Sequence, residues 1–276
     1  MSLLVLHDRD GRATFDAEQC RAAGAALHEA YAAAAPFPHV VIDDFLDPNL
    51  LRAMLPGFPD SEGRRFFDRH QERFKYQIAP DQIADPALRG LLYELNGPAI
   101  LAFLEALTGI EGLVPDPYYI GGGLHETRTG GHLSVHADFN LHEQMKLERR
   151  LNLLIYLNED WREVWGGDLE LWGRDMRAYE VKVPPLLGRA VIFATDADSY
   201  HGHPEPLACP PDRSRRSIAT YYYTVPRTDG PARTTRFRVR PGSGDRSDRR
   251  VALDHFIQDW VPPRLQRYAR RLNPFR

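Results

Sequence analysis

The order of hydrophobic and polar positions divides the chain into a helical first part and a β-rich second part. Residues 15–35 are alanine-rich with apolar positions four residues apart, which predicts an amphipathic helix. A short apolar run at 39–42 predicts a strand. The region 85–109 begins with Asp-Pro, a typical N-cap and first-turn pair, and predicts two helices divided at Asn96-Gly97-Pro98.

After residue 113 the pattern changes to short β-rich runs separated by Gly, Pro and Asn. The predicted strands are 133–136, 151–157, 168–172, 179–183, 190–193 and 217–225. Many short strands with turn signals are typical of a sandwich or jelly roll, and not of alternating strand and helix units. Helices first and strands later therefore predict an α+β, mainly β, fold in which N-terminal helices buttress a β-barrel.

We expect three regions within one domain. Residues 1–112 would form a helical support region with one early strand, and residues 113–226 the barrel core that carries any catalysis. The tail, 227–276, is rich in arginine and would pack on the core as a strand and a helix. Alternating arginines at 236–240 predict a solvent-facing edge strand, and those at 264–272 a final helix with a solvated cationic face.

The composition is that of an ordinary globular protein, with 43% hydrophobic and 26% charged residues in a chain of 276. A formal net charge of −3 gives no global reason to expect binding to nucleic acid or to an anionic membrane. No run resembles an export signal or the ~20 apolar residues of a membrane span. Cys20 and Cys209 lie far apart and are expected to be free thiols, which favours a cytoplasmic location. The oligomeric state cannot be read from the sequence.

His136 and Asp138 are two residues apart, so on a strand they would project to the same face. Two imidazoles and one carboxylate can occupy one face of an octahedral Fe(II), leaving the other face for a chelating co-substrate and dioxygen. The third ligand could be His201 or His203, which are two residues apart and would therefore face the same side of a strand. We take His201 as the ligand and His203 as a neighbour that supports a ligand or faces the substrate. The remaining histidines in this part, at 125, 132 and 142, are assigned to the surface or the core.

A second group of polar residues is suited to binding an anion. Arg215 and Ser217 fall on one side of a strand, where a guanidinium and a hydroxyl could hold a carboxylate. In the opposite register Arg216 would take this role, and the spacing leaves the choice open. Asn152 and Tyr156 share a face of another strand, and their side chains are candidates to point into the barrel opposite Arg215. The Tyr156 hydroxyl needs a partner, which could be a bound carboxylate or a backbone carbonyl.

In sequence order these residues resemble the prolyl 4-hydroxylase-like branch of the Fe(II)/2-oxoglutarate-dependent dioxygenases. The similar stretch comprises Gly121-Gly122-Gly123, His136-x-Asp138, Tyr156-Leu157-Asn158, Gly166-Gly167-Asp168-Leu169, His201 and Arg215-x-Ser217, within 121–224. The resemblance implies a double-stranded β-helix, with His136, Asp138 and His201 as ligands of Fe(II). It also implies 2-oxoglutarate as co-substrate, its far carboxylate bound by Arg215 and Tyr156 with help from Ser217. Ascorbate is a further candidate cofactor.

The resemblance implies an enzyme that hydroxylates an unactivated C–H bond and releases succinate and CO2. An aspartate at 138 favours hydroxylation over halogenation, because related halogenases leave that ligand position to chloride. The interval between His201 and Arg215 is longer than is usual for the family and rich in proline, which predicts an inserted loop. The substrate could be a prolyl residue of a peptide or a small molecule such as an amino acid, a natural-product intermediate or a saccharide.

A non-catalytic β-barrel that binds zinc is the alternative from another functional class. Zinc accepts three histidines and an aspartate in a tetrahedron, and His203 would complete that set. A structural zinc site gives no reason for an Arg, Ser and Tyr anion-binding group, so the sequence favours the enzyme.

Overall fold

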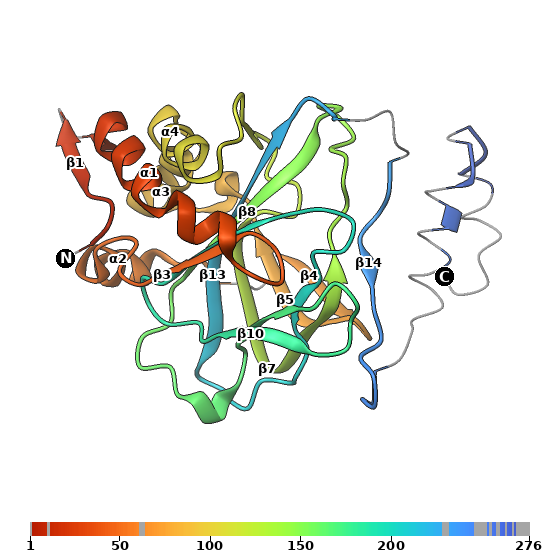
Figure 1. Cartoon of the computed structure of the whole chain (residues 1–276). Helices are drawn as coiled ribbons and strands as arrows, with labels where there is room; N and C mark the ends of the chain where they lie inside the picture. The colour runs from red at the N-terminus through yellow and green to blue at the C-terminus, as the bar shows by residue number, and fades with distance from the viewer. Residues whose placement is uncertain are drawn as a thin grey trace.

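In the computed structural model, four α-helices lie together on one side of a β-barrel, and strand β14 lies at the opposite side (Figure 1). The structure describes residues 2–9, 12–60, 64–227, 232–245 and scattered positions between 253 and 268. The helix predicted at 264–272 therefore lies largely outside the described residues. No helix among the described residues is both long and apolar enough to cross a membrane.

Local capping chemistry explains where the helices begin. Their bounds are α1 Ala17–Ala33, α2 Pro48–Met54, α3 Pro86–Leu95 and α4 Pro98–Thr108, with 3-10 turns at Leu55–Gly57, Pro80–Gln82 and Glu163–Trp165. The Asp16 carboxylate accepts hydrogen bonds from two backbone amides at the start of α1, and Asp85 caps α3 in the same way. Gly97 is the N-cap of α4, so the predicted division of this region is confirmed.

Helix α1 packs on α4 at a position where only glycine fits. A Cβ added at Gly24 would lie 2.2 Å from the carbonyl oxygen of Phe103. The two helices and α3 cover one face of the sheet, and their apolar residues join the buried strand residues Leu153, Ile155 and Ile218 in one core. This core holds the barrel on the side away from the pocket described below.

The described strands form a small hairpin and one large antiparallel sheet. The hairpin is β1 Leu6–Arg9 with β2 Arg12–Phe15, and the sheet contains β3 His39–Ile42, β4 Arg65–Arg69, β5 Glu72–Ile78, β6 Val114–Pro115, β7 Gly123–Ala137, β8 Glu148–Tyr156, β9 Leu169–Trp172, β10 Tyr179–Val183, β11 Ala190–Ala194, β12 His201–His203, β13 Ser214–Thr224 and β14 Arg236–Phe237. Its main path runs β10-β9-β12-β7-β13-β8-β11-β3. This arrangement confirms the predicted double-stranded β-helix, or jelly roll, with helices against one side.

Strand β7 changes partners along its length. Its first part lies between β5 and β13, and its last residues lie between β12 and β14. In this last part His136 pairs with both His201 and Phe237. One strand therefore connects the β4–β5 hairpin to β12 and to the tail of the chain.

The β4–β5 hairpin was not predicted from the sequence, although it forms one wall of the barrel mouth. The pairing of β5 with β7 shifts register between Arg73 and Lys75.

 The φ of Phe74 is 47°, which is in the left-handed region. Such an irregularity breaks the alternation by which a strand is recognised in a sequence.

The tail pairs with the barrel over a shorter stretch than predicted. An edge strand is confirmed only at β14, and the arginines after it are not simply solvated. The Arg238 guanidinium donates two hydrogen bonds, of 3.1 and 2.9 Å, to the Tyr200 hydroxyl. Arg240 forms an ion pair of 2.9 Å with Asp245. Arg238 is still exposed, as expected for a solvent-facing edge strand, whereas Arg240 is half-buried beside Asp245, so the expectation is wrong for Arg240 alone.

Candidate metal centre and anion-binding pocket

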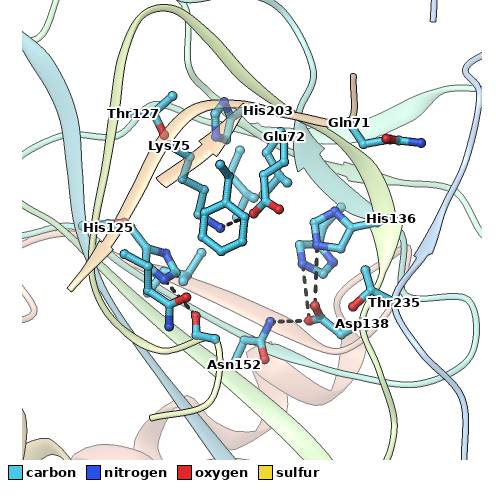
Figure 2. Close-up of a pocket in the computed structure, with 18 of the residues that line it drawn as sticks. Gln71, Glu72, Lys75, His125, Thr127, His136, Asp138, Asn152, His203 and Thr235 are labelled. Atoms are coloured by element: carbon cyan, nitrogen blue, oxygen red, sulfur yellow. Dashed lines mark hydrogen bonds and ion pairs between the residues drawn. The ribbon is translucent and has the colours of Figure 1, made fainter. Parts of the chain in front are cut away.

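Three side chains that could hold a metal ion meet where β7 ends and β12 begins. His136 is near the end of β7, Asp138 follows it, and His201 lies directly across from His136 in the sheet. One ligand atom from each residue lies within 4.8 Å of the others. The Nε2 atoms of His136 and His201 are each 3.5 Å from an oxygen of Asp138. Figure 2 shows the contact between His136 and Asp138.

The other ring nitrogen of each histidine is held by the backbone. His136 Nδ1 lies 2.9 Å from the Ser134 carbonyl oxygen, and His201 Nδ1 lies 3.0 Å from that of Ser199. A carbonyl oxygen only accepts hydrogen bonds, so both Nδ1 atoms carry the proton and both Nε2 lone pairs are free for a metal. Burial, with the nearby His136, lowers the pKa of His201 to about 4, which keeps this ring neutral at neutral pH. The donor set therefore fits a divalent ion such as Fe(II).

Asp138 is buried but ionised. Burial alone opposes its charge, yet the Arg149 guanidinium and the two imidazoles hold the pKa of Asp138 well below its usual range. Arg149 Nη2 lies 3.2 Å from the carboxylate, and Asn152 Nδ2 donates a hydrogen bond of 2.9 Å to the same oxygen. The Arg149 guanidinium itself lies 3.5 Å from the centroid of the Tyr221 ring. These contacts orient the carboxylate towards the histidines.

Gly202 explains how closely β12 approaches β7. A Cβ added there would lie 2.8 Å from the Leu133 carbonyl oxygen and 2.9 Å from that of Ser134. A side chain at this position would push the strands apart and move His201 away from His136.

A cavity of about 300 Å³ connects these three residues with Arg215 and Ser217. Arg215 is buried, its Nε donates to the Gly167 carbonyl oxygen at 2.7 Å, and its Nη2 lies 3.3 Å from the Tyr156 hydroxyl. Gly167 has a φ of 81°, and a Cβ there would lie 3.0 Å from Arg215 Cδ. The second glycine of the Gly-Gly-Asp motif thus supplies both the space and the acceptor that position this arginine.

Strand β13 directs Arg215, and not Arg216, into the cavity. The Arg216 guanidinium lies on the other side, where Nη2 is 3.2 Å from Glu126 and the group lies 4.4 Å from the centroid of the Phe58 ring. Tyr156 lies beside Arg215, as expected for a residue of the anion-binding group. Asn152 also lines the cavity, but at the end occupied by Asp138.

Two histidines outside the candidate triad line the cavity. His203 is buried there, but its ligand atoms do not join the three-residue group found among the described residues. His125 also lines the cavity, so its assignment to the surface or the core is wrong. Gly130, with a φ of 77°, interrupts the alternation of β7, which explains how His125 and His136 face the same space although they are an odd number of residues apart. Burial and the charge of Lys75 keep the pKa of His125 well below its usual range.

Further charged residues at the cavity come from the unpredicted hairpin and from the start of β8. Arg65, Arg69, Glu72 and Lys75 line the cavity from β4 and β5, and Arg149 lines it from β8. No motif identifies them, because charged residues at half-exposed strand positions are usually solvated. Figure 2 shows Lys75 reaching towards Glu72, with an Nζ to Oε1 distance of 2.8 Å.

This ion pair predicts a pH-dependent contribution to stability. Burial opposes the charge of Glu72, but Lys75 holds the pKa of Glu72 below its ordinary value. Such a carboxyl stabilises the fold above its unfolded pKa, and the stabilisation is lost as the pH falls through the folded pKa. We expect Glu72→Gln to reduce the free energy of unfolding by about 2 kcal/mol at neutral pH and by much less near pH 3. Thermal unfolding followed by circular dichroism across this range measures the difference.

Asp68→Asn is the matched control for this prediction. Asp68 lies on the same hairpin, but its contact with Arg73 is 3.3 Å long and nearly half exposed on both sides. Exposed pairs contribute about 0–1 kcal/mol, so this variant should behave like the wild type. An equal loss of stability in both variants at every pH would contradict the assigned role of Glu72.

Comparison with known proteins gives a family for the central part of the chain. Residues 122–223 match the family model of the 2OG-Fe(II) oxygenase superfamily. No curated protein matches the sequence. The family uses Fe(II) and 2-oxoglutarate, and the matched stretch contains all three candidate ligands.

 

Solved structures with the same fold are prolyl hydroxylases. A prolyl-4-hydroxylase from Pseudomonas putida shares 22% identity at a TM-score of 0.51, over 72% of this chain and 98% of that one. A prolyl hydroxylase from Trichoplax adhaerens, in complex with a hypoxia inducible factor peptide fragment, shares 15% identity at a TM-score of 0.55, over 75% and 91%. A prolyl 4-hydroxylase from Phytophthora capsici shares 17% identity at a TM-score of 0.50, over 96% and 78%.

At these identities the solved structures show a common fold alone, while the family match covers the barrel core and supports the class of chemistry. The predicted resemblance is therefore confirmed at the level of fold and family. Residues 122–223 are therefore similar to a 2OG-Fe(II) oxygenase domain, and this similarity supports an enzyme of the dioxygenase class.

Proposed function

We propose that this protein hydroxylates an unactivated C–H bond of its substrate and converts 2-oxoglutarate and O2 to succinate and CO2. His136, Asp138 and His201 would hold Fe(II), and Arg215 would bind the far carboxylate of 2-oxoglutarate. One observation carries the proposal: a single cavity joins a buried two-histidine, one-carboxylate group to a buried arginine. Among the described residues, no carboxylate forms an ion pair with that arginine, which leaves it available to an anionic co-substrate.

The residues around Arg215 support its proposed role. The Tyr156 hydroxyl and the Ser217 hydroxyl would add hydrogen bonds to the same carboxylate. Asn152, predicted as a co-substrate contact, is better suited to orienting Asp138, because its amide donates to that carboxylate. Each of these groups comes from β8 or β13, so the central strands of the sheet fix their positions.

Bound Fe(II) and 2-oxoglutarate would supply the oxygen-activating chemistry, and the protein would bind, orient and shield them. Asp138 offers a charged ligand, because Arg149 stabilises its ionised form. Leu154, Leu169 and Phe237 give the cavity an apolar wall, with the Phe237 ring centroid 5.3 Å from that of His136. Such a wall limits access of water and so protects the target bond from competing reactions.

The substrate is proposed only as a class. The Trichoplax relative is in complex with a peptide, which makes a prolyl residue of a peptide one candidate. Small molecules such as an amino acid, a natural-product intermediate or a saccharide are the others, because a shared fold does not fix a substrate. Ascorbate is proposed as an accessory reductant of the iron.

The zinc alternative receives less support than the enzyme. A closed tetrahedral site needs a fourth protein ligand, and His203 does not join the group formed by the other three among the described residues. A zinc site would also leave the buried Arg215 without a function.

The proposal extends to the regions of the chain. Residues 113–226 would form the catalytic core, 1–112 its helical support, and 227–276 a segment packed on the core, all within one domain. The pairing of β14 with β7 supports the last of these assignments. Free, buried thiols at Cys20 and Cys209 agree with the proposed cytoplasmic location.

Anaerobic titration of the protein with Fe(II) and 2-oxoglutarate tests the proposed function. A visible charge-transfer band of iron-chelated 2-oxoglutarate is expected, followed by succinate release when oxygen is admitted. Protein loaded with Zn(II) is the control and should give neither signal. Absence of the band with Fe(II) bound would overturn the proposal.

A further inference from the structure

The β4–β5 hairpin presents an unusual face to the cavity. Arg65, Phe67 and Arg69 are alternate residues of β4, and all three line the cavity. The residues between them point elsewhere: Phe66 stacks on Tyr76 with ring centroids 4.7 Å apart, and Asp68 contacts Arg73. The cavity therefore meets an Arg-Phe-Arg row at its mouth.

This row gives the cavity a charge opposite to that of the whole protein. The chain has a formal net charge of −3, yet five cationic side chains and two carboxylates line the cavity. Two of the cations are matched, Lys75 by Glu72 and Arg149 by Asp138. The charges of Fe(II) and 2-oxoglutarate would cancel each other, which leaves Arg65, Arg69 and Arg215 as the surplus cations of the cavity. Arg215 would contact the co-substrate, so Arg65 and Arg69 are the two that stay open to a further anion.

Neither arginine of the row has a carboxylate of its own in the described part of the fold, because Glu72, which acts on Arg69 at longer range, is paired with Lys75. No described carboxylate forms an ion pair with Arg65 or Arg69. The Arg65 guanidinium lies 4.8 Å from the Phe67 ring centroid, and Lys75 Nζ lies 5.5 Å from the same ring. Cations that gather around a cavity mouth focus the field there and attract anionic ligands.

We propose that the substrate carries a carboxylate, which Arg65 and Arg69 bind at the mouth while its reactive C–H bond reaches the metal centre. This inference rests on the proposed function and adds the chemical class of the substrate. Phe67, between the two arginines, would contact an apolar part of the substrate next to its carboxylate. The acid could be the side chain of a peptide or a free small molecule, since both present the same group.

Matched acidic and neutral probes test this inference. The enzyme is loaded with Mn(II) and 2-oxoglutarate, so that it can bind a probe without turning it over. One pair is the acetylated peptide Glu-Pro-Glu and its Gln-Pro-Gln counterpart, and the other is N-acetylproline and its amide. Calorimetry is expected to give the acid a dissociation constant about tenfold lower than that of its neutral analogue in at least one pair. The preference should fall as ionic strength rises. The pair that shows it identifies a peptidic or a small-molecule source.

The double variant Arg65→Gln/Arg69→Gln is expected to lose this preference. Arg73→Gln is the control, because it removes a positive charge from the same hairpin at a residue that does not line the cavity. The control should keep the wild-type preference.

The inference would be overturned by any of three results: the acid and the neutral analogue bind equally, the preference survives in the double variant, or no probe binds. The charge-transfer band of the Fe(II) enzyme separates this failure from failure of the proposed function. A normal band with no acid preference removes only the carboxylate class, whereas loss of the band in the wild type removes the enzyme assignment itself.

Discussion

Replacing Asp138 with alanine is expected to abolish succinate formation from 2-oxoglutarate, with a fall in rate of at least about 1000-fold. Asp138 is the only carboxylate of the three-residue group, and Arg149 and Asn152 both direct it towards the histidines. Its loss would remove a charged ligand and leave the buried Arg149 guanidinium without its carboxylate partner. Iron content per protein and succinate release measure the two consequences separately.

Asp116→Asn is a matched control for this substitution. Asp116 is also buried and lies 3.3 Å from a histidine, His142, but it does not line the cavity. An asparagine there keeps one of the two oxygens that accept backbone amides, and the site lies outside the cavity, so iron content and turnover per folded protein should stay close to wild type. Coupled succinate release by folded Asp138→Ala protein at the wild-type rate would show that Asp138 is not a ligand.

Replacing Arg215 with glutamine is expected to raise the KM for 2-oxoglutarate about 100-fold while the iron content stays unchanged. The guanidinium is buried in the cavity beside the Tyr156 hydroxyl, where a charge-assisted contact with a carboxylate is strong. Glutamine keeps some hydrogen bonding but removes the charge and the paired donors. Initial rates across a series of 2-oxoglutarate concentrations provide the measurement.

Arg216→Gln distinguishes the two neighbouring arginines. Arg216 contacts Glu126 outside the cavity, so this variant should keep the wild-type KM for 2-oxoglutarate. The opposite result, a large rise for Arg216→Gln and none for Arg215→Gln, would place the co-substrate elsewhere.

The sequence predicted the local parts of this structure well. The Asp-Pro start of α3 and the division before α4 follow from capping chemistry, which depends on neighbouring residues alone. The strands at 179–183 and 39–42 were predicted with the observed bounds. His136 and Asp138 could be paired because they are separated by a single residue.

Contacts between distant segments were harder to predict. Parity could not choose between Arg215 and Arg216, because β13 is buried on both faces: Ile218 packs into the helical core while Ser217 lines the cavity. The rule that a strand alternates between a buried apolar face and an exposed polar face fails for such a strand. The charged residues of β4 and β5 become part of the site only through the pairing of β5 with β7, which no local pattern reveals.

The double pairing of His136 has a consequence for the order of events during synthesis. The histidine leaves the ribosome long before either of its sheet partners, His201 in β12 and Phe237 in β14. The last wall around the ligands can close only when nearly all of the described chain has been made. Iron would therefore be held in a closed site only after β14 has been made and has paired with β7.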